Sequence, residues 1–159
     1  MSPDAERDEI LAEVAEAFRT PRPDWFCDAR HCCECAAHEA ELQAETVETL
    51  RREVLGDGAW DPVAFIKNPD GFKYFMPALA RLAYGTGQDY FLTSFMFHLR
   101  PDRIETFTDR QRTAIEKLLI HLSFAIASEI ERCNDFHELE WALRRIRGEP
   151  GPCSYQGQA

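Results

Sequence analysis

The chain has 159 residues, 45% of them hydrophobic and 11% aromatic, which is enough apolar material for one folded core and argues against disorder throughout. It carries 18 Lys and Arg against 28 Asp and Glu, a formal net charge of −10. Because phosphate binding draws on Lys and Arg, this balance argues against nucleic acid and anionic lipid as partners. No apolar run approaches the roughly 18–20 residues that cross a bilayer, and the acidic N-terminus shows no secretory signal. We therefore expect a cytoplasmic protein without a membrane span.

Apolar residues at three- and four-residue spacing predict helices in chain order. The first spans about 4–19, with Ser2 as its cap. The second spans about 29–43, with Asp28 as its cap. Further helical stretches are predicted over 47–55, 72–82 (with Pro77 interrupting it or opening a new turn), 90–99, 109–130 behind a Thr108 capping box, and 136–146. No strand alternation persists, so the prediction is an all-α, single-domain irregular bundle of about six or seven helices over residues 1–147. The Gly- and Pro-rich tail, 148–159, is predicted to be disordered.

Four of the six cysteines lie between Cys27 and Cys35, next to two histidines. Bunched Cys and His in a chain without a targeting segment are more typical of metal or redox chemistry than of a disulfide scaffold. If the segment is one helix, His31, Cys35 and His38 share a stripe and Cys32 lies one turn from Cys35. These residue types favour zinc, with iron and copper(I) as alternatives. The predicted metal ligands are His31, Cys32, Cys35 and His38.

One helix presents its ligands from one side only, so a tetrahedral site requires either a distorted turn at 31–35 or a donor from elsewhere. The candidate extra donors are Cys27, His98, His121 and Cys133. The competing interpretation is that the block is the buried face of an amphipathic helix, since Leu42 falls on the same stripe.

The same Cys/His block also allows two other kinds of chemistry, thiol redox and general-base catalysis. Cys32 and Cys35 form a C-x-x-C pair, which is a lesser, thiol-redox hypothesis. Glu34 and Glu39 are either general bases near a metal-bound water or, more simply, solvated acids. Asp61 is either a carboxylate that orients a metal-bound His or a residue that caps a turn, and the turn is slightly favoured. No catalytic constellation is recognisable, so the sequence leaves enzymatic activity undecided.

The motif order resembles a family of small bacterial all-helical proteins of unknown function. The pieces that carry the resemblance are the H-C-x-x-C-x-x-H block at 31–38, the W-D-P at 60–62 and the aromatic-rich helix ending in P-A-L at 77–79. The resemblance covers roughly residues 20–125. In that family a polar residue, often acidic, stands where this chain has Cys33, which makes Cys33 the least expected ligand. The resemblance implies a site at the block and no particular reaction.

The sequence therefore favours a zinc site of structural or regulatory role. The alternative is an acidic partner-binding module, such as an antidote to a basic toxin. Residues 1–55 hold 14 acidic and 6 basic side chains, which would attract a cationic protein.

Overall fold

Helices form the ordered framework of the chain. A computed structural model describes residues 2–56 and 61–150. The elements are α1 (Pro3–Ala17), α2 (Cys33–Gln43), α3 (Arg52–Leu55), the 3₁₀ turn η2 (Pro62–Phe65), α4 (Pro69–Leu82), the 3₁₀ turn η3 (Gly87–Asp89), α5 (Leu92–His98), α6 (Pro101–Ile104), α7 (Asp109–Ala125), α8 (Ala127–Cys133) and α9 (Phe136–Arg147). Within these ranges there is no strand, which confirms the all-α prediction. The division of the chain into a domain over 1–147 and a tail stays a prediction, because the tail from residue 151 onward lies outside the described ranges.

Side-chain caps explain why the sequence predicts the N-termini of α1 and α7 correctly. The Ser2 side chain accepts the N–H of Ala5, and Pro3 opens α1 without an N–H to satisfy. At α7, the Thr108 side chain accepts the N–H of Gln111, and the Gln111 side chain accepts the N–H of Thr108. This reciprocal capping box is the one that the sequence predicts.

The described residues contain nine α-helices, more than the six or seven expected, because one predicted segment is divided and the short helix α6 lies where no helix is predicted. The predicted 109–130 helix ends at Ala125 and resumes as α8 after Ile126, whose φ of −125° leaves helical geometry. The predicted 47–55 stretch is a turn followed by the four-residue α3. In contrast, α4 continues through Pro77, so the expected interruption does not occur.

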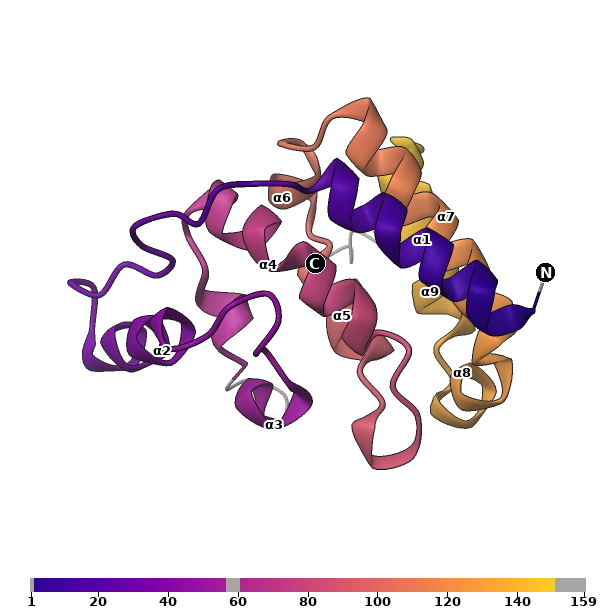
Figure 1. Ribbon diagram of the computed structural model, residues 1–159, viewed down its shortest axis with the longest axis horizontal. Coiled ribbons are helices and arrows are strands. Elements are labelled where there is room, and N and C mark those ends of the chain that lie inside the picture. The colour runs from indigo at the N-terminus through magenta and orange to yellow at the C-terminus, as the bar shows by residue number, and fades with distance from the viewer. Residues whose placement is uncertain (1, 57–60, 151–159) are drawn as a thin grey trace, which may run out of the picture.

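The helices lie in two groups, joined through α4 and α5 (Figure 1). Helices α1, α7 and α9 pack together at the right of the view, and α2 and α3 lie at the left. The strongest packing partner of α2 is the short turn η2. The candidate metal-binding block therefore lies at one end of the molecule, away from the α1–α7–α9 group.

A buried polar network holds η2 against α5 and α6. His98 Nε2 lies 2.5 Å from Asp61 Oδ2, and Asp61 Oδ1 accepts the N–H of Val63 at 2.9 Å. The Arg103 guanidinium donates to the carbonyls of Val63, at 2.7 Å, and Ile66, at 3.3 Å. Burial lowers the pKa of Arg103 to about 10. Asp61 thus caps the turn, as favoured from the sequence, and it also pairs with a His; its neighbour Trp60 lies outside the described residues.

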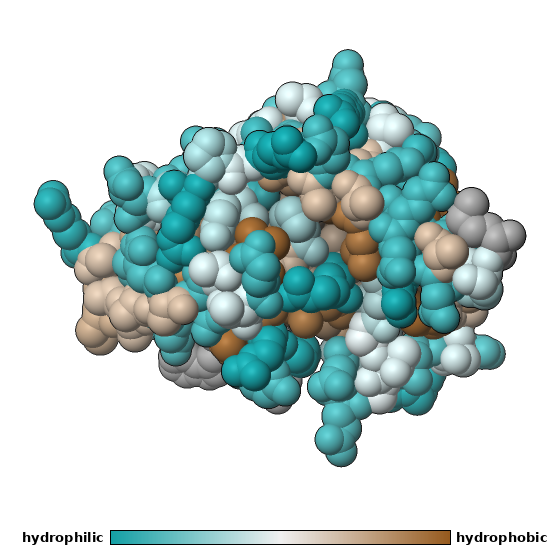
Figure 2. Space-filling view, in the orientation of Figure 1, coloured by the Kyte–Doolittle hydropathy of each residue, from teal (hydrophilic) through white to brown (hydrophobic). Residues whose placement is uncertain are grey.

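The face shown in Figure 2 is mainly hydrophilic, with weakly hydrophobic residues gathered at the α2 end on the left and some strongly hydrophobic ones near the middle. Among the helices of the described ranges, none combines the length and the apolar character needed to cross a bilayer.

Candidate metal centre

The site begins with a turn that precedes α2. The sequence predicts a helix from Ala29 capped by Asp28, and this prediction is wrong: α2 begins at Cys33. Asp28 instead closes a turn, because its side chain accepts the N–H of Arg30 at 3.2 Å and its carbonyl accepts the N–H of His31 at 3.0 Å. The residue that caps α2 is Cys32, whose extended backbone has φ −163° and ψ 172°.

The loop before this turn is held from both sides. The Glu39 carboxylate on α2 accepts the N–H groups of Phe26, at 2.9 Å, and Cys27, at 2.6 Å. From the other side, the Lys67 N–H donates to the carbonyl of Phe26 at 2.9 Å. Since Phe26 and Cys27 are buried, Glu39 satisfies two N–H groups that water does not reach. Glu39 therefore fixes the backbone at Phe26 and Cys27, just before the turn that precedes α2.

The turn brings three of the four predicted ligands together. The donor atoms of His31, Cys32 and Cys35 all lie within 4.8 Å of one another. His31 Nδ1 lies 3.6 Å from Cys35 Sγ, and the Cys35 N–H points at Cys32 Sγ, 3.4 Å away. His31 and Cys32 are exposed, whereas Cys35 is buried. The distorted turn at 31–35, one of the two options left open above, is the one observed.

The fourth predicted ligand, His38, lies outside this group. Its ring stacks on Phe65 of η2 with the centroids 4.3 Å apart, and its Nδ1 lies 3.1 Å from Glu41 Oε2. Its Nε2 is buried without a hydrogen-bond partner and lies 3.9 Å from Glu34 Oε1. His38 thus packs α2 against η2, in agreement with the core interpretation for this one residue.

Two of the more distant donors are engaged elsewhere. His98 pairs with Asp61 inside the core, and His121 Nδ1 lies 2.7 Å from the Tyr84 hydroxyl. Cys133 is the last residue of α8. None of these three belongs to the group around Cys32. Cys33 is exposed and also outside the group, as the family resemblance implies.

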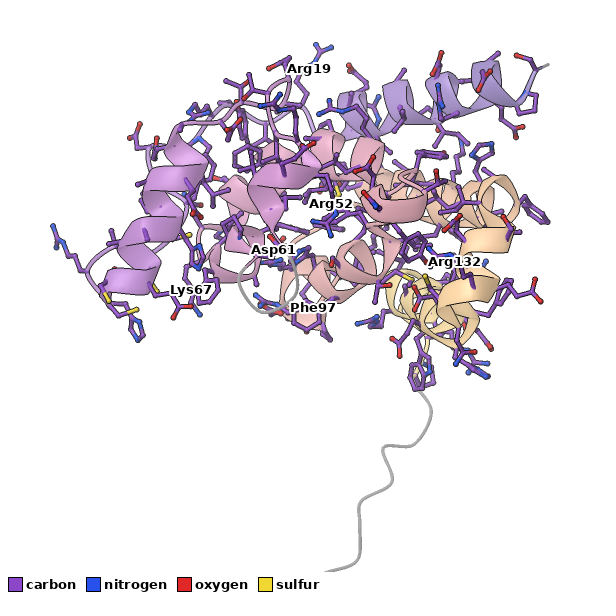
Figure 3. All side chains as sticks on the ribbon, turned by 90° about the horizontal axis from the view of Figure 1, so that it is seen from below. Arg19, Arg52, Asp61, Lys67, Phe97 and Arg132 are labelled. Atoms are coloured by element: carbon purple, nitrogen blue, oxygen red, sulfur yellow. The ribbon has the colours of Figure 1, made fainter. Side chains whose placement is uncertain are left out.

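A cleft of about 890 Å³ opens beside the three donors. Its lining includes the aromatic rings of Trp25 and Phe65, the buried Cys27 and the exposed Lys67. Figure 3 shows the sulfur atoms at the end of α2, at the left, with Lys67 labelled near them. A ligand in this cleft would reach the donor group from the solvent side.

The two thiols of the group have opposite pKa shifts. The pKa of Cys32 is lowered to about 7, first by the N–H of Cys35 and then by His31. The pKa of Cys35 is raised, first because its thiol donates to Cys32 and then by burial. The pair therefore loses its first proton easily and its second with difficulty. Burial raises the pKa of the neighbouring Cys27 to about 12.

We expect iodoacetamide to modify Cys32 first, Cys33 more slowly and Cys27 last in the reduced, metal-free protein near pH 7. The thiolate is the reactive form, and a thiol with a pKa of about 7 is about half ionised at that pH. Cys27 is both buried and protonated. Peptide mapping of timed samples measures the order; equal rates at Cys32 and Cys33 would contradict the capping interaction.

The sequence leaves Glu39 as a general base or a solvated acid, and the structure gives it a further role in holding the loop. Its carboxylate is occupied by the N–H groups of Phe26 and Cys27 and by the Gln43 side chain. No local sequence pattern predicts this role, because Glu39 lies 13 and 12 positions from Phe26 and Cys27. The only signal in the sequence is that Glu39 lies one helical turn after Cys35, on the helix that carries the site. Phe65 of η2 also contributes to the site, because its ring stacks on His38.

Replacing Glu39 with alanine is expected to lower the free energy of unfolding by about 1–3 kcal/mol, because two buried N–H groups lose their acceptor. The matched control is Glu48→Ala, an exposed Glu for which a change within about 0.5 kcal/mol is expected. Urea unfolding followed by circular dichroism measures both. Equal effects of the two substitutions would show that Glu39 does not hold the loop.

The fold and the site together define a small all-helical protein with a His/Cys/Cys group that could hold a metal ion. No protein-family model, no curated protein and no solved structure matches the chain. The family resemblance stated from the motifs therefore stays a prediction.

Proposed function

We propose that His31, Cys32 and Cys35 bind one zinc ion and that the site has a regulatory role. The observation that carries the proposal is the convergence of one imidazole and two sulfur atoms within 4.8 Å. Two thiolates and an imidazole form a donor set that zinc prefers, and iron or copper(I) are the alternatives for such soft ligands. Three protein ligands leave one position of a tetrahedral ion for a further ligand from the cleft.

The position of the donors favours regulation over a purely structural role. All three lie within five consecutive residues, so an ion bound by them joins the 28–31 turn to the first turn of α2 and links no distant elements. Two of the three residues are exposed, which allows the ion to exchange with solvent. Occupancy would then change the order of the turn without determining whether the core folds.

Calorimetric titration of zinc into reduced, chelator-treated protein tests the proposal. We expect one equivalent to bind, and binding to be lost in the Cys32→Ser/Cys35→Ser double variant. Cys33→Ser is the matched control, since Cys33 is an exposed neighbour outside the group, and it should bind as the unmodified chain does. Absence of binding, or binding that survives the double variant, would overturn the proposal.

A second candidate function is the binding of a basic partner, and the acidic outer face of α1 favours it. The helix carries one basic residue, Arg7, against the six acids Asp4, Glu6, Asp8, Glu9, Glu13 and Glu16. Such a face attracts a cationic segment at long range.

Binding of a cationic helical peptide tests this candidate function. The affinity should fall with added salt. It should also fall in the double variant Asp8→Asn/Glu9→Gln, but not in the exposed control pair Glu48→Gln/Glu138→Gln. Equal loss in both double variants would leave only a general charge effect.

A further inference from the structure

We infer that Cys32 and Cys35 exchange with low-molecular-weight disulfides and close a reversible intrachain disulfide. The two sulfur atoms belong to the group whose members all lie within 4.8 Å, and both residues are free thiols. Closure requires the two side chains to rotate until their sulfur atoms reach the bond length of about 2.05 Å. The pair has the C-x-x-C spacing, with its first cysteine at a helix start, that disulfide-exchanging proteins use.

The unequal exposure of the two thiols assigns their roles. Cys32 is exposed at the start of α2, where a disulfide in solution reaches its sulfur. Cys35 is 8% exposed and lies one helical turn further on, so an external disulfide reaches it poorly. Cys32 is therefore the attacking thiol and Cys35 the resolving thiol.

The cleft beside the pair accommodates the oxidant. Its volume of about 890 Å³ is larger than a small disulfide requires, and its lining joins Cys32 and Cys35 to Trp25, Phe65 and Lys67. A folded protein substrate would have to bring its own disulfide into this concave space. The geometry therefore points to small-molecule disulfides as the substrate class.

The exchange balances in two steps. The Cys32 thiolate attacks one sulfur of a disulfide RSSR, the S–S bond breaks, and one RS⁻ leaves and takes a proton from solvent. Cys35 then gives its proton to His31 Nδ1, 3.6 Å away, and attacks the Cys32 sulfur of the mixed disulfide. The bond between Cys32 and the second R–S group breaks, and the departing RS⁻ takes that proton from His31 and leaves as RSH. The protein dithiol loses two electrons, and RSSR gains them as two RSH.

The same two sulfur atoms serve the proposed zinc ion, so the ion and the disulfide exclude one another. This exclusion rests on the proposed function, whereas the exchange rests on the geometry of the thiols alone. Oxidation would release zinc, and zinc would protect the thiols.

Incubation of reduced, metal-free full-length chain with oxidised glutathione, followed by acid quenching and peptide mass mapping, tests the exchange. We expect a Cys32–Cys35 disulfide and two reduced glutathiones per chain. Cys35→Ser should stop at a glutathione adduct on Cys32, and Cys32→Ser should react at least about tenfold more slowly. Cys33→Ser, the exposed neighbour, should behave as the unmodified chain. Adducts that persist equally on Cys32 and Cys33, or a disulfide that involves Cys33, would overturn the inference.

The same incubation with saturating zinc separates this inference from the proposed function. We expect disulfide formation to slow at least about tenfold when zinc is bound. An unchanged rate would overturn the exclusion. Calorimetric zinc binding by the reduced chain, together with a failure to form the disulfide in metal-free solution, would overturn the exchange and leave the zinc site standing.

Discussion

Replacing Asp61 with alanine is expected to lower the free energy of unfolding by about 3–5 kcal/mol, the largest effect on stability predicted for a single side chain. The substitution removes the partner of His98 Nε2, 2.5 Å away, and both residues are nearly fully buried. It also removes the acceptor for the N–H of Val63, so η2 loses its cap. Because η2 carries Phe65 against His38, the loss also loosens the support of α2.

Asp102→Ala is the matched control, since Asp102 is an exposed Asp whose partner is Arg100. Exposed ion pairs contribute about 0–1 kcal/mol, so its effect should be small. Chemical unfolding of the two variants measures the difference. A loss below about 1 kcal/mol for Asp61→Ala would contradict the role assigned to the Asp61–His98 pair.

Zinc affinity is expected to fall steeply as the pH drops, and the two thiols set the slope. Ligand thiols must be deprotonated before they bind. Above pH 7 Cys32 is mostly thiolate, so binding displaces one proton, from Cys35, and affinity changes about tenfold per pH unit. Below pH 7 binding displaces both thiol protons, and affinity falls by up to about a hundredfold per pH unit.

Competition titrations against a chelator of known affinity, at pH values on both sides of 7, measure this slope. Cys33→Ser should show the same slope, since Cys33 lies outside the group. An affinity that is constant over this range would indicate carboxylate ligands on the acidic surface and would contradict thiolate binding.

The sequence predicted local features well. The cap at Ser2, the capping box at Thr108 and the all-α fold depend on residues a few positions apart, and the structure confirms them. The density of soft donors near Cys32 likewise indicated where a candidate site lies, and three of the four predicted ligands converge.

The features that the sequence did not predict depend on distant partners. Residues 29–32 are predicted to be helical, but Asp28 accepts the N–H groups of Arg30 and His31 and closes a turn there. The residues just before this turn, Phe26 and Cys27, are held by Glu39, 13 and 12 positions further along the chain. A helical wheel assumes one continuous helix, so it does not give the relative positions of residues before and after this turn. His38 shares a helix face with Cys35, yet it packs against Phe65, a contact across 27 positions that no local pattern shows. The pairing of Asp61 with His98 spans 37 positions, so no local pattern predicts it either.

X-ray absorption at the zinc edge, on the one-to-one complex of the reduced chain, tests most directly whether His31, Cys32 and Cys35 share an ion. We expect two sulfur neighbours at about 2.3 Å, with the remaining neighbours, one imidazole nitrogen among them, at about 2.0–2.1 Å. The sulfur signal should fall to one neighbour in Cys35→Ser and stay at two in Cys33→Ser. A shell of oxygen and nitrogen alone, or a sulfur count unchanged in Cys35→Ser, would show that Cys32 and Cys35 do not share the ion.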